Sequence, residues 1–187
     1  MRALTALSAL LLLAYPLAVY YGLSRWGIGV IGIIFVALFV IRIAAGHQTK
    51  LKELKYIAWL SGAAGIILTL CATLFREHGW FTYYPVVVNL LMFLLFFSSL
   101  WQSQTLVERL ARLQEPELPE SGVRYTRNVT KVWCGYFVIN GSIALYTCFL
   151  PLEIWTLYNG LLSYLFAGSL FTIEWLVRGY IRKSNEQ

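Results

Sequence analysis

Charge is scarce in this chain, and one kind of charged residue is missing altogether. Only 13% of the 187 residues are charged, aspartate does not occur, and 59% of the residues are hydrophobic. The mean hydropathy is +0.66. A water-soluble domain of this length needs far more charge to cover its surface, whereas a bilayer accepts apolar residues both inside and outside a fold. The composition therefore excludes an ordinary soluble domain and predicts an integral membrane protein.

Histidine and cysteine are also rare, which limits the chemistry that the chain can perform. There are two histidines, His47 and His78, and three cysteines without CxxC spacing. Cys71, Cys134 and Cys148 fall inside apolar windows, where cysteine acts as a small apolar residue. The sequence contains no paired histidine and carboxylate and no metal-ligand cluster. We therefore expect no catalytic residues, no cofactor and no metal.

Long apolar runs are abundant. Because the hydrocarbon core of a bilayer is about 30 Å thick, a membrane-spanning helix needs roughly 20 mostly apolar residues. Six windows qualify, at about residues 4–22, 27–45, 56–75, 83–101, 129–150 and 155–177. They predict an all-α integral membrane protein in which residues 1–187 form a single domain, a bundle of six transmembrane helices. The first window, where Arg2 precedes ALTALSALLLLA, also resembles a secretory signal peptide, but no small-x-small cleavage site follows, so we expect a retained helix.

Positive charge is distributed unevenly among the predicted connections. If the N-terminus lies inside the cell, every lysine and arginine except Arg25 and Arg76 falls on the inner side. Lysine and arginine concentrate in short cytoplasmic loops, so both termini are predicted to be cytoplasmic. The same distribution accounts for the net charge of +6 through contact with anionic lipid headgroups, and no nucleic-acid partner is expected.

The longest predicted connection, about residues 102–128, contains an amphipathic segment. In SQTLVERLARLQ the leucines share one helical face and the charged residues fall away from it, the two sets being Leu106, Leu110 and Leu113, and Glu108, Arg109 and Arg112. This pattern predicts an interfacial helix between the fourth and fifth spans. Pro116 and Pro119 are expected to end it.

A basic ridge is predicted at the start of the fifth span. In VRYTRNVTKVW, Arg124, Arg127 and Lys131 are three and four residues apart, so they share one face of a helix. Arginine can hold a phosphate through two parallel hydrogen bonds. Together with Arg109 and Arg112, this ridge is a candidate site for a lipid headgroup or for a carrier protein that bears phosphopantetheine. The alternative is that these residues only orient the chain and contact headgroups.

One carboxylate lies inside a predicted span, where a charge costs on the order of 3 kcal/mol. Glu174 precedes Arg178 by four residues, a spacing that allows a local ion pair on one helix. The alternative is that Glu174 faces the bundle and pairs with the basic ridge, forming a polar pocket.

Three asparagines, Asn89, Asn140 and Asn159, also lie within predicted spans. Buried amides hydrogen-bond between membrane helices, so we expect them to join helices. If the last two helices pack as a hairpin, Asn140 and Ser142 are expected to face Asn159 and Ser163.

Small residues recur at every fourth position of the third window, at Ser61, Gly65, Thr69 and Thr73. Small residues allow two membrane helices to approach closely. This stripe therefore predicts a helix seam.

Residues 105–178 carry a resemblance to a known family. The segment LVERLARLQEPELPESGVRYTRNVTKVW, followed by INGSIALYT, WTLYNGLLSYLFAGSLF and EWLVR, resembles a family of bacterial inner-membrane proteins. Members of that family are encoded among genes for aryl-polyene and related fatty-acid or polyketide pigments, and some are labelled ketosynthase. Ketosynthase activity is rejected here because His47 and His78 fall on opposite sides of the membrane and neither has a plausible cysteine partner.

The resemblance implies a membrane component of lipid-like product synthesis or delivery. We therefore expect a non-catalytic, multi-pass protein of the bacterial inner membrane that docks biosynthetic enzymes, an acyl carrier protein or a phosphate-bearing lipid at its basic cytoplasmic face. The alternative function is a transporter or flippase for a lipid-like product, with Glu174 and the buried asparagines lining its route.

Overall fold

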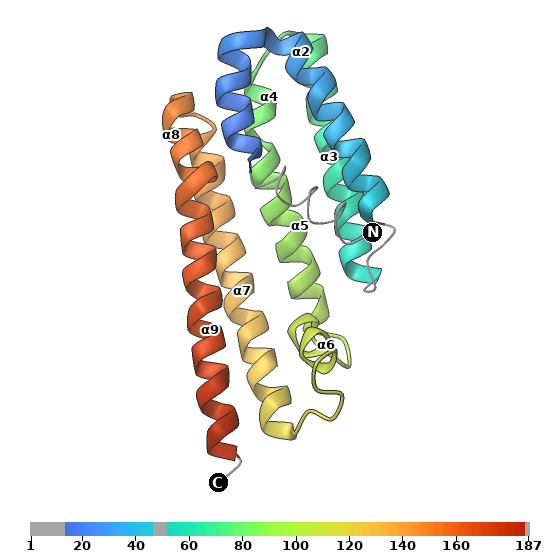
Figure 1. Cartoon of the computed structure of the whole chain (residues 1–187), viewed down its shortest axis with the longest axis vertical. Helices are drawn as coiled ribbons and strands as arrows, with labels where there is room; N and C mark the ends of the chain where they lie inside the picture. Colours follow the sequence, from blue (N-terminus) through green and yellow to red (C-terminus); the bar gives the residue numbers. More distant parts are fainter. Residues whose placement is uncertain (1–13, 47–51, 186–187) are drawn as a thin grey trace.

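The computed structural model describes residues 14–46 and 52–185, and every regular element within them is a helix. In chain order the elements are α2 (Tyr15–Gly46), α3 (Lys52–Phe75), α4 (Gly79–Thr82), α5 (Tyr84–Ser99), α6 (Leu106–Arg112), α7 (Glu120–Thr147), α8 (Leu152–Leu157), the π-helix η1 (Tyr158–Leu162) and α9 (Ser163–Asn185). Helix α3 lies beside the C-terminal part of α2, α9 lies beside α7, and α5 runs between these pairs (Figure 1). The predicted all-helical class is confirmed.

Helix α2 is a hairpin with its tip at Gly27. The backbone of Gly27 has φ 73° and ψ 170°, a region open only to glycine, and it divides α2 into arms at 15–26 and 28–46. The arms fold back on one another, since a Cβ on Gly22 would collide with Ile31. The rings of Tyr15 and Phe35 are 4.7 Å apart across the arms. The predicted turn between the first two windows is therefore present, as the bend of α2 shows (Figure 1).

Four helices of the described residues are long and apolar enough to cross a membrane, namely Tyr15–Ala44, Lys55–Phe75, Gly79–Ser99 and Leu152–Gly179. The predicted windows at 56–75, 83–101 and 155–177 coincide with three of them. The windows at 4–22 and 27–45 meet in α2, and residues 1–13 of the first, including the segment that resembles a signal peptide, lie outside the described residues. The window at 129–150 forms most of α7, which is long but more polar than the four. Among the described residues the structure thus shows four helices apolar enough to span a membrane, the first of them bent at Gly27, and it does not confirm the count of six.

A proline shapes the junction of α4 and α5. Pro85 has no backbone N–H, so it cannot donate to the carbonyl of Phe81 four residues earlier. The hydroxyl of Tyr15 donates to that carbonyl instead, at 2.9 Å, and Trp155 Nε1 donates to the neighbouring Thr82 carbonyl at 3.0 Å. These two hydrogen bonds therefore connect α2 and α8 to α4, just before α5 begins. Tyr15, Phe81 and Trp155 form one buried core together with Phe35.

The helix predicted between the fourth and fifth windows is present as α6. Thr105 caps its N-terminus by accepting from the Glu108 backbone N–H at 3.3 Å. Leu106 is buried and Glu108 is only 3% exposed, whereas Leu110 and Leu113 are exposed. The reason is that α6 packs against α5 and α7, which turns Glu108 inward and leaves two of the leucines outside.

The predicted seam on α3 is confirmed. A Cβ on Gly65 would overlap the ring of Phe39, and a Cβ on Gly32 would lie 2.8 Å from Thr73 Oγ1. At both positions the glycine leaves room for a side chain of the other helix to pack on its backbone, which allows α3 to approach the second arm of α2 closely.

Candidate functional site

The two arginines of α6 are used to build the connection between α5 and α7. Arg112 contacts Glu108 Oε1 through Nε and Nη2, both at 2.9 Å, and donates to the Pro116 carbonyl at 2.9 Å. Arg109 donates to the Gln104 carbonyl from Nε at 3.2 Å and from Nη2 at 3.0 Å, and also to the side-chain oxygen of Gln102. Both guanidinium groups therefore stabilise the connection between α5 and α7.

The remaining predicted cations form a basic surface on α7, defined as Arg124, Arg127 and Lys131. All three are exposed. Arg127 Nη2 donates to the Leu100 carbonyl at 2.8 Å, which caps the C-terminal end of α5. Arg124 and Lys131 have no hydrogen bond or ion pair with any described residue. The ridge is thus present on one face of α7, with one member braced against α5 and two available.

Glu174 lies where α9 meets the first turns of α7. Tyr125 donates to the Glu174 backbone carbonyl at 3.1 Å, and Arg178 is close enough to act electrostatically on both residues. Burial raises the pKa of the Tyr125 phenol, the nearby Glu174 carboxylate raises this pKa further, and Arg178 lowers it. Among the described residues, neither Arg178 nor the basic surface lies within ion-pair distance of the Glu174 carboxylate. The structure therefore does not bring Glu174 together with the predicted ridge.

The asparagines join three helices. Asn140 of α7 donates from Nδ2 to Asn89 Oδ1 of α5 at 2.9 Å, and Tyr158 of η1 donates to Asn140 Oδ1 at 2.8 Å. Asn89 Nδ2 completes the chain by donating to the Pro85 carbonyl at 2.8 Å. Asn159 donates instead to Thr147 Oγ1 at 3.0 Å. The predicted joining of helices by these amides is confirmed.

The expectation that Asn140 and Ser142 face Asn159 and Ser163 holds only in part. Asn140, Asn159 and Ser163 line one cavity, although Asn140 and Asn159 bond to different partners. Ser142 is exposed and donates to the carbonyl of Val138 in its own helix, at 2.8 Å. The Ser163 carbonyl accepts from Tyr136 at 2.9 Å. Helices α7 and α9 do pack side by side, but η1 holds one extra residue per turn, which rotates the following residues relative to a regular helix.

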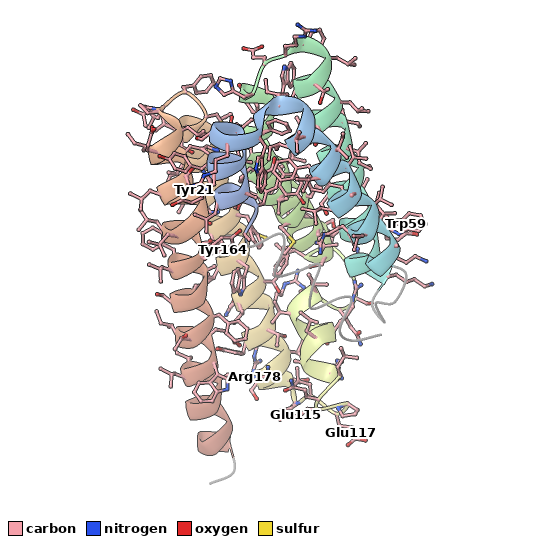
Figure 2. All side chains as sticks on the ribbon, turned by 45° about the horizontal axis from the view of Figure 1, so that its top comes forward. Tyr21, Trp59, Glu115, Glu117, Tyr164 and Arg178 are labelled. Atoms are coloured by element: carbon pink, nitrogen blue, oxygen red, sulfur yellow. The ribbon has the colours of Figure 1, made fainter. Side chains whose placement is uncertain are left out.

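A cavity of about 350 Å³ lies between α2, α5, α7, η1 and α9. The asparagines Asn89, Asn140 and Asn159 line it, and so do Arg42 and Tyr84, whereas Glu174 does not. Tyr164 lines it from α9, well above the level of Arg178 (Figure 2). This volume falls at the small end of the range for ligand pockets.

Sequence reasoning missed Arg42 and Tyr84. Arg42 had a visible signal, because it is a charge inside the predicted apolar window at 27–45. It was grouped with the cytoplasmic cations because it lies near the end of that window. Tyr84 had no signal, since an apolar span near a membrane surface commonly contains tyrosine.

Comparisons with known proteins found no relative of this chain. No family model, no curated protein and no solved structure matches this chain. The described residues also contain no cluster of three or more histidine, cysteine or acidic side chains that could hold a metal ion.

Proposed function

We propose that the chain is a non-catalytic, six-pass accessory protein of the bacterial inner membrane that docks a phosphate-bearing partner on its basic surface. In this proposal the window at 4–22, which continues into the first arm of α2, and the second arm of α2 supply the first two passes. Helix α7 supplies the fifth, and both termini face the cytoplasm. The partner is an acyl carrier protein, or an enzyme that carries one, in the synthesis of a lipid-like product of the aryl-polyene type. The resemblance of residues 105–178 supports this choice of pathway.

One observation carries the proposal. Arg124 and Lys131 are exposed and unpaired among the described residues, on a helix that Arg127 braces against the end of α5. Cations held on a rigid surface can meet an acidic carrier without reorganising, and complementary charge raises the rate of docking. Because Arg109 and Arg112 already have partners, they are assigned to building the surface rather than to contacting the carrier.

The docking proposal is tested by replacing the two available cations together. In Arg124→Gln with Lys131→Gln, the amount of holo acyl carrier protein that co-purifies should fall several-fold, while membrane insertion stays normal. The matched control is Arg25→Gln with Arg76→Gln, which removes the same charge from the opposite end of the bundle. Unchanged co-purification in the first variant, or an equal loss in both, contradicts the proposal.

A second function, movement of a lipid-like product through the bundle, is favoured by the cavity that the three asparagines line. In this alternative the product passes through the cavity and not along Glu174, because Glu174 does not line the cavity. Asn159→Ala should then reduce the appearance of product in the outer leaflet with synthesis unchanged, whereas Glu174→Gln should not. Normal export by Asn159→Ala counts against transport.

A further inference from the structure

The most unusual group in the membrane-spanning part of the chain is the Arg42 side chain. Arg42 is one helical turn from Gly46, the last residue of α2, where a long cationic side chain ordinarily extends toward the surface and water. Here the side chain is half-buried and its Nε donates to Ser61 Oγ of α3 at 3.4 Å. Ser61 is nine residues beyond Lys52, the first residue of α3, or about 13 Å along the helix axis. The guanidinium therefore turns into the bundle.

No described carboxylate neutralises this charge. The contact with Ser61 is long, and it is the one hydrogen bond that Arg42 makes to the described residues. A guanidinium carries several N–H donors in a flat fork, so most of them remain available to a ligand. An arginine inside a bundle usually pairs with an acidic group or marks a binding site, because its charge is costly to bury alone.

Tyr84 supplies a second, independent observation beside Arg42. Its side chain is 4% exposed, and its hydroxyl has no hydrogen-bond partner among the described residues. The hydroxyl lies within electrostatic range of Arg42, and Ser61 is close to it without meeting hydrogen-bond geometry. Nearly all buried hydroxyls have a partner, so an unpaired one that lines a cavity is available to bond to a ligand atom.

The rest of the lining is either already bonded or apolar. Asn89 and Asn140 bond to each other, and Tyr136 donates to the Ser163 carbonyl, so these groups shape the wall. The remaining wall is built by apolar side chains, among them Pro16, Val88, Met92, Trp133, Phe137 and Ala167. The remaining N–H donors of Arg42 and the hydroxyl of Tyr84 thus lie beside a largely hydrophobic space.

We propose that this cavity binds an amphiphile whose headgroup is an oxyanion, a carboxylate or a phosphate, on an apolar tail. Arg42 donates to the anionic oxygens, the Tyr84 hydroxyl donates to the same group, and the tail lies against the apolar wall. A charge-assisted bond to arginine is stronger than one between neutral groups, and the largely apolar wall strengthens it further. The site is separate from the basic surface on α7, so it stands whether or not that surface docks a carrier.

The test measures the binding of labelled probes to the full chain in phosphatidylcholine nanodiscs. The probes are dodecanoate, dodecyl phosphate, dodecanol and inorganic phosphate. We expect at least one anionic amphiphile to bind about tenfold or more tightly than dodecanol, and inorganic phosphate to bind far more weakly. The tighter of the two anions identifies the headgroup. Equal binding of the anions and dodecanol, or equal binding of inorganic phosphate and dodecyl phosphate, would overturn the proposal.

Two variants assign the effect to the residues named. Arg42→Gln should abolish the preference for the anion, and Arg42→Lys should retain part of it. The matched control is Arg25→Gln, which removes one arginine from the other arm of α2, outside the cavity lining, and should bind like the parent chain. An equal loss in Arg25→Gln would show attraction to membrane charge only and would overturn the site.

Tyr84→Phe keeps the proposal testable if Arg42→Gln fails to fold. This change removes an unpaired buried hydroxyl, so the melting temperature of the ligand-free protein should stay the same or rise. Its affinity for the anion should nevertheless fall by about threefold or more. A stable Tyr84→Phe protein with unchanged affinity for both anions would contradict the assigned role of Tyr84 and, with it, the site.

Discussion

Asn140 of α7 and Asn89 of α5 share a hydrogen bond of 2.9 Å in the interior of the bundle. Tyr158 of η1 donates to the other side of the same Asn140 amide, at its Oδ1. One side chain therefore connects three helices, and these helices also form part of the cavity wall. The arrangement is held by polar groups that are buried among the helices, so each bond restricts how the helices pack.

Replacing the shared amide should weaken the whole bundle. Asn140→Ala leaves Asn89 Oδ1 and the Tyr158 hydroxyl without their bonds to Asn140, so we expect a loss of about 1–2 kcal/mol in the free energy of unfolding. Unfolding in mixed micelles of denaturing and mild detergent measures this change. Ser142→Ala is the matched control, because Ser142 is exposed and bonds only within its own helix, and its effect should stay within about 0.5 kcal/mol. Equal stabilities would mean that the amide joins nothing.

Adding a single methyl group at the seam between α2 and α3 should lower the free energy of unfolding. In Gly65→Ala the new Cβ overlaps the ring of Phe39, which is fully buried and cannot move aside, so we expect a destabilisation of about 1–3 kcal/mol. Gly168→Ala is the comparison, since nothing lies within 4 Å of a Cβ at Gly168. That change should be neutral or stabilising because alanine favours helices over glycine by about 1 kcal/mol. Similar unfolding energies for the two variants would count against the packing described.

The tip of the α2 hairpin should require glycine at one position but not at its neighbour. Gly27 has a positive φ of 73°, so Gly27→Ala should cost about 1–3 kcal/mol through backbone strain alone, although no atom lies within 4 Å of its Cβ position. Gly29 is equally open but has an ordinary helical backbone, so Gly29→Ala should be tolerated. Thermal unfolding of the two variants measures the difference. A tolerated Gly27→Ala would show that the helix bends elsewhere.

Arg127 and Arg124 should differ in what they do, although both are exposed arginines on one face. Arg127→Gln removes the cap from the Leu100 carbonyl, so stability should fall by about 0.5–1.5 kcal/mol. Arg124→Gln breaks no bond to a described residue and should leave stability within about 0.5 kcal/mol. Chemical unfolding separates the two effects from any loss of carrier docking. If both variants unfold like the parent chain, Arg127 does not brace α5.

For the basic ridge, the sequence predicts which residues share a helical face but not which groups they bond to. The spacing of Arg124, Arg127 and Lys131 placed them on one helical face, and the structure has all three exposed there. Their partners could not be predicted, because the end of α5 reaches Arg127 only after α5 and α7 have packed together. The sequence also predicts Arg109 and Arg112 as part of this surface, but their hydrogen bonds lie within the connection between α5 and α7.

The burial of Glu108 and the inward turn of Arg42 could not have been found in the same way. Helical periodicity shows which residues share a face, but it does not show which face the rest of the chain covers. Glu108 is covered because α6 packs into the corner between α5 and α7. Arg42 reaches Ser61 only once α2 and α3 have packed together, so the contact between them cannot be predicted from the sequence.

The amino-acid sequence by itself determined where this chain is helical and apolar, and where it turns. These properties depend on hydrophobic run length and on glycine and proline at single positions such as Gly27 and Pro85, which act locally. The tertiary structure alone decided that Asn140 meets Asn89 rather than Asn159, and that Arg42 and Tyr84 face one cavity. Those contacts depend on the rotation and axial shift of one helix against another, which are set by the packing of all the helices together.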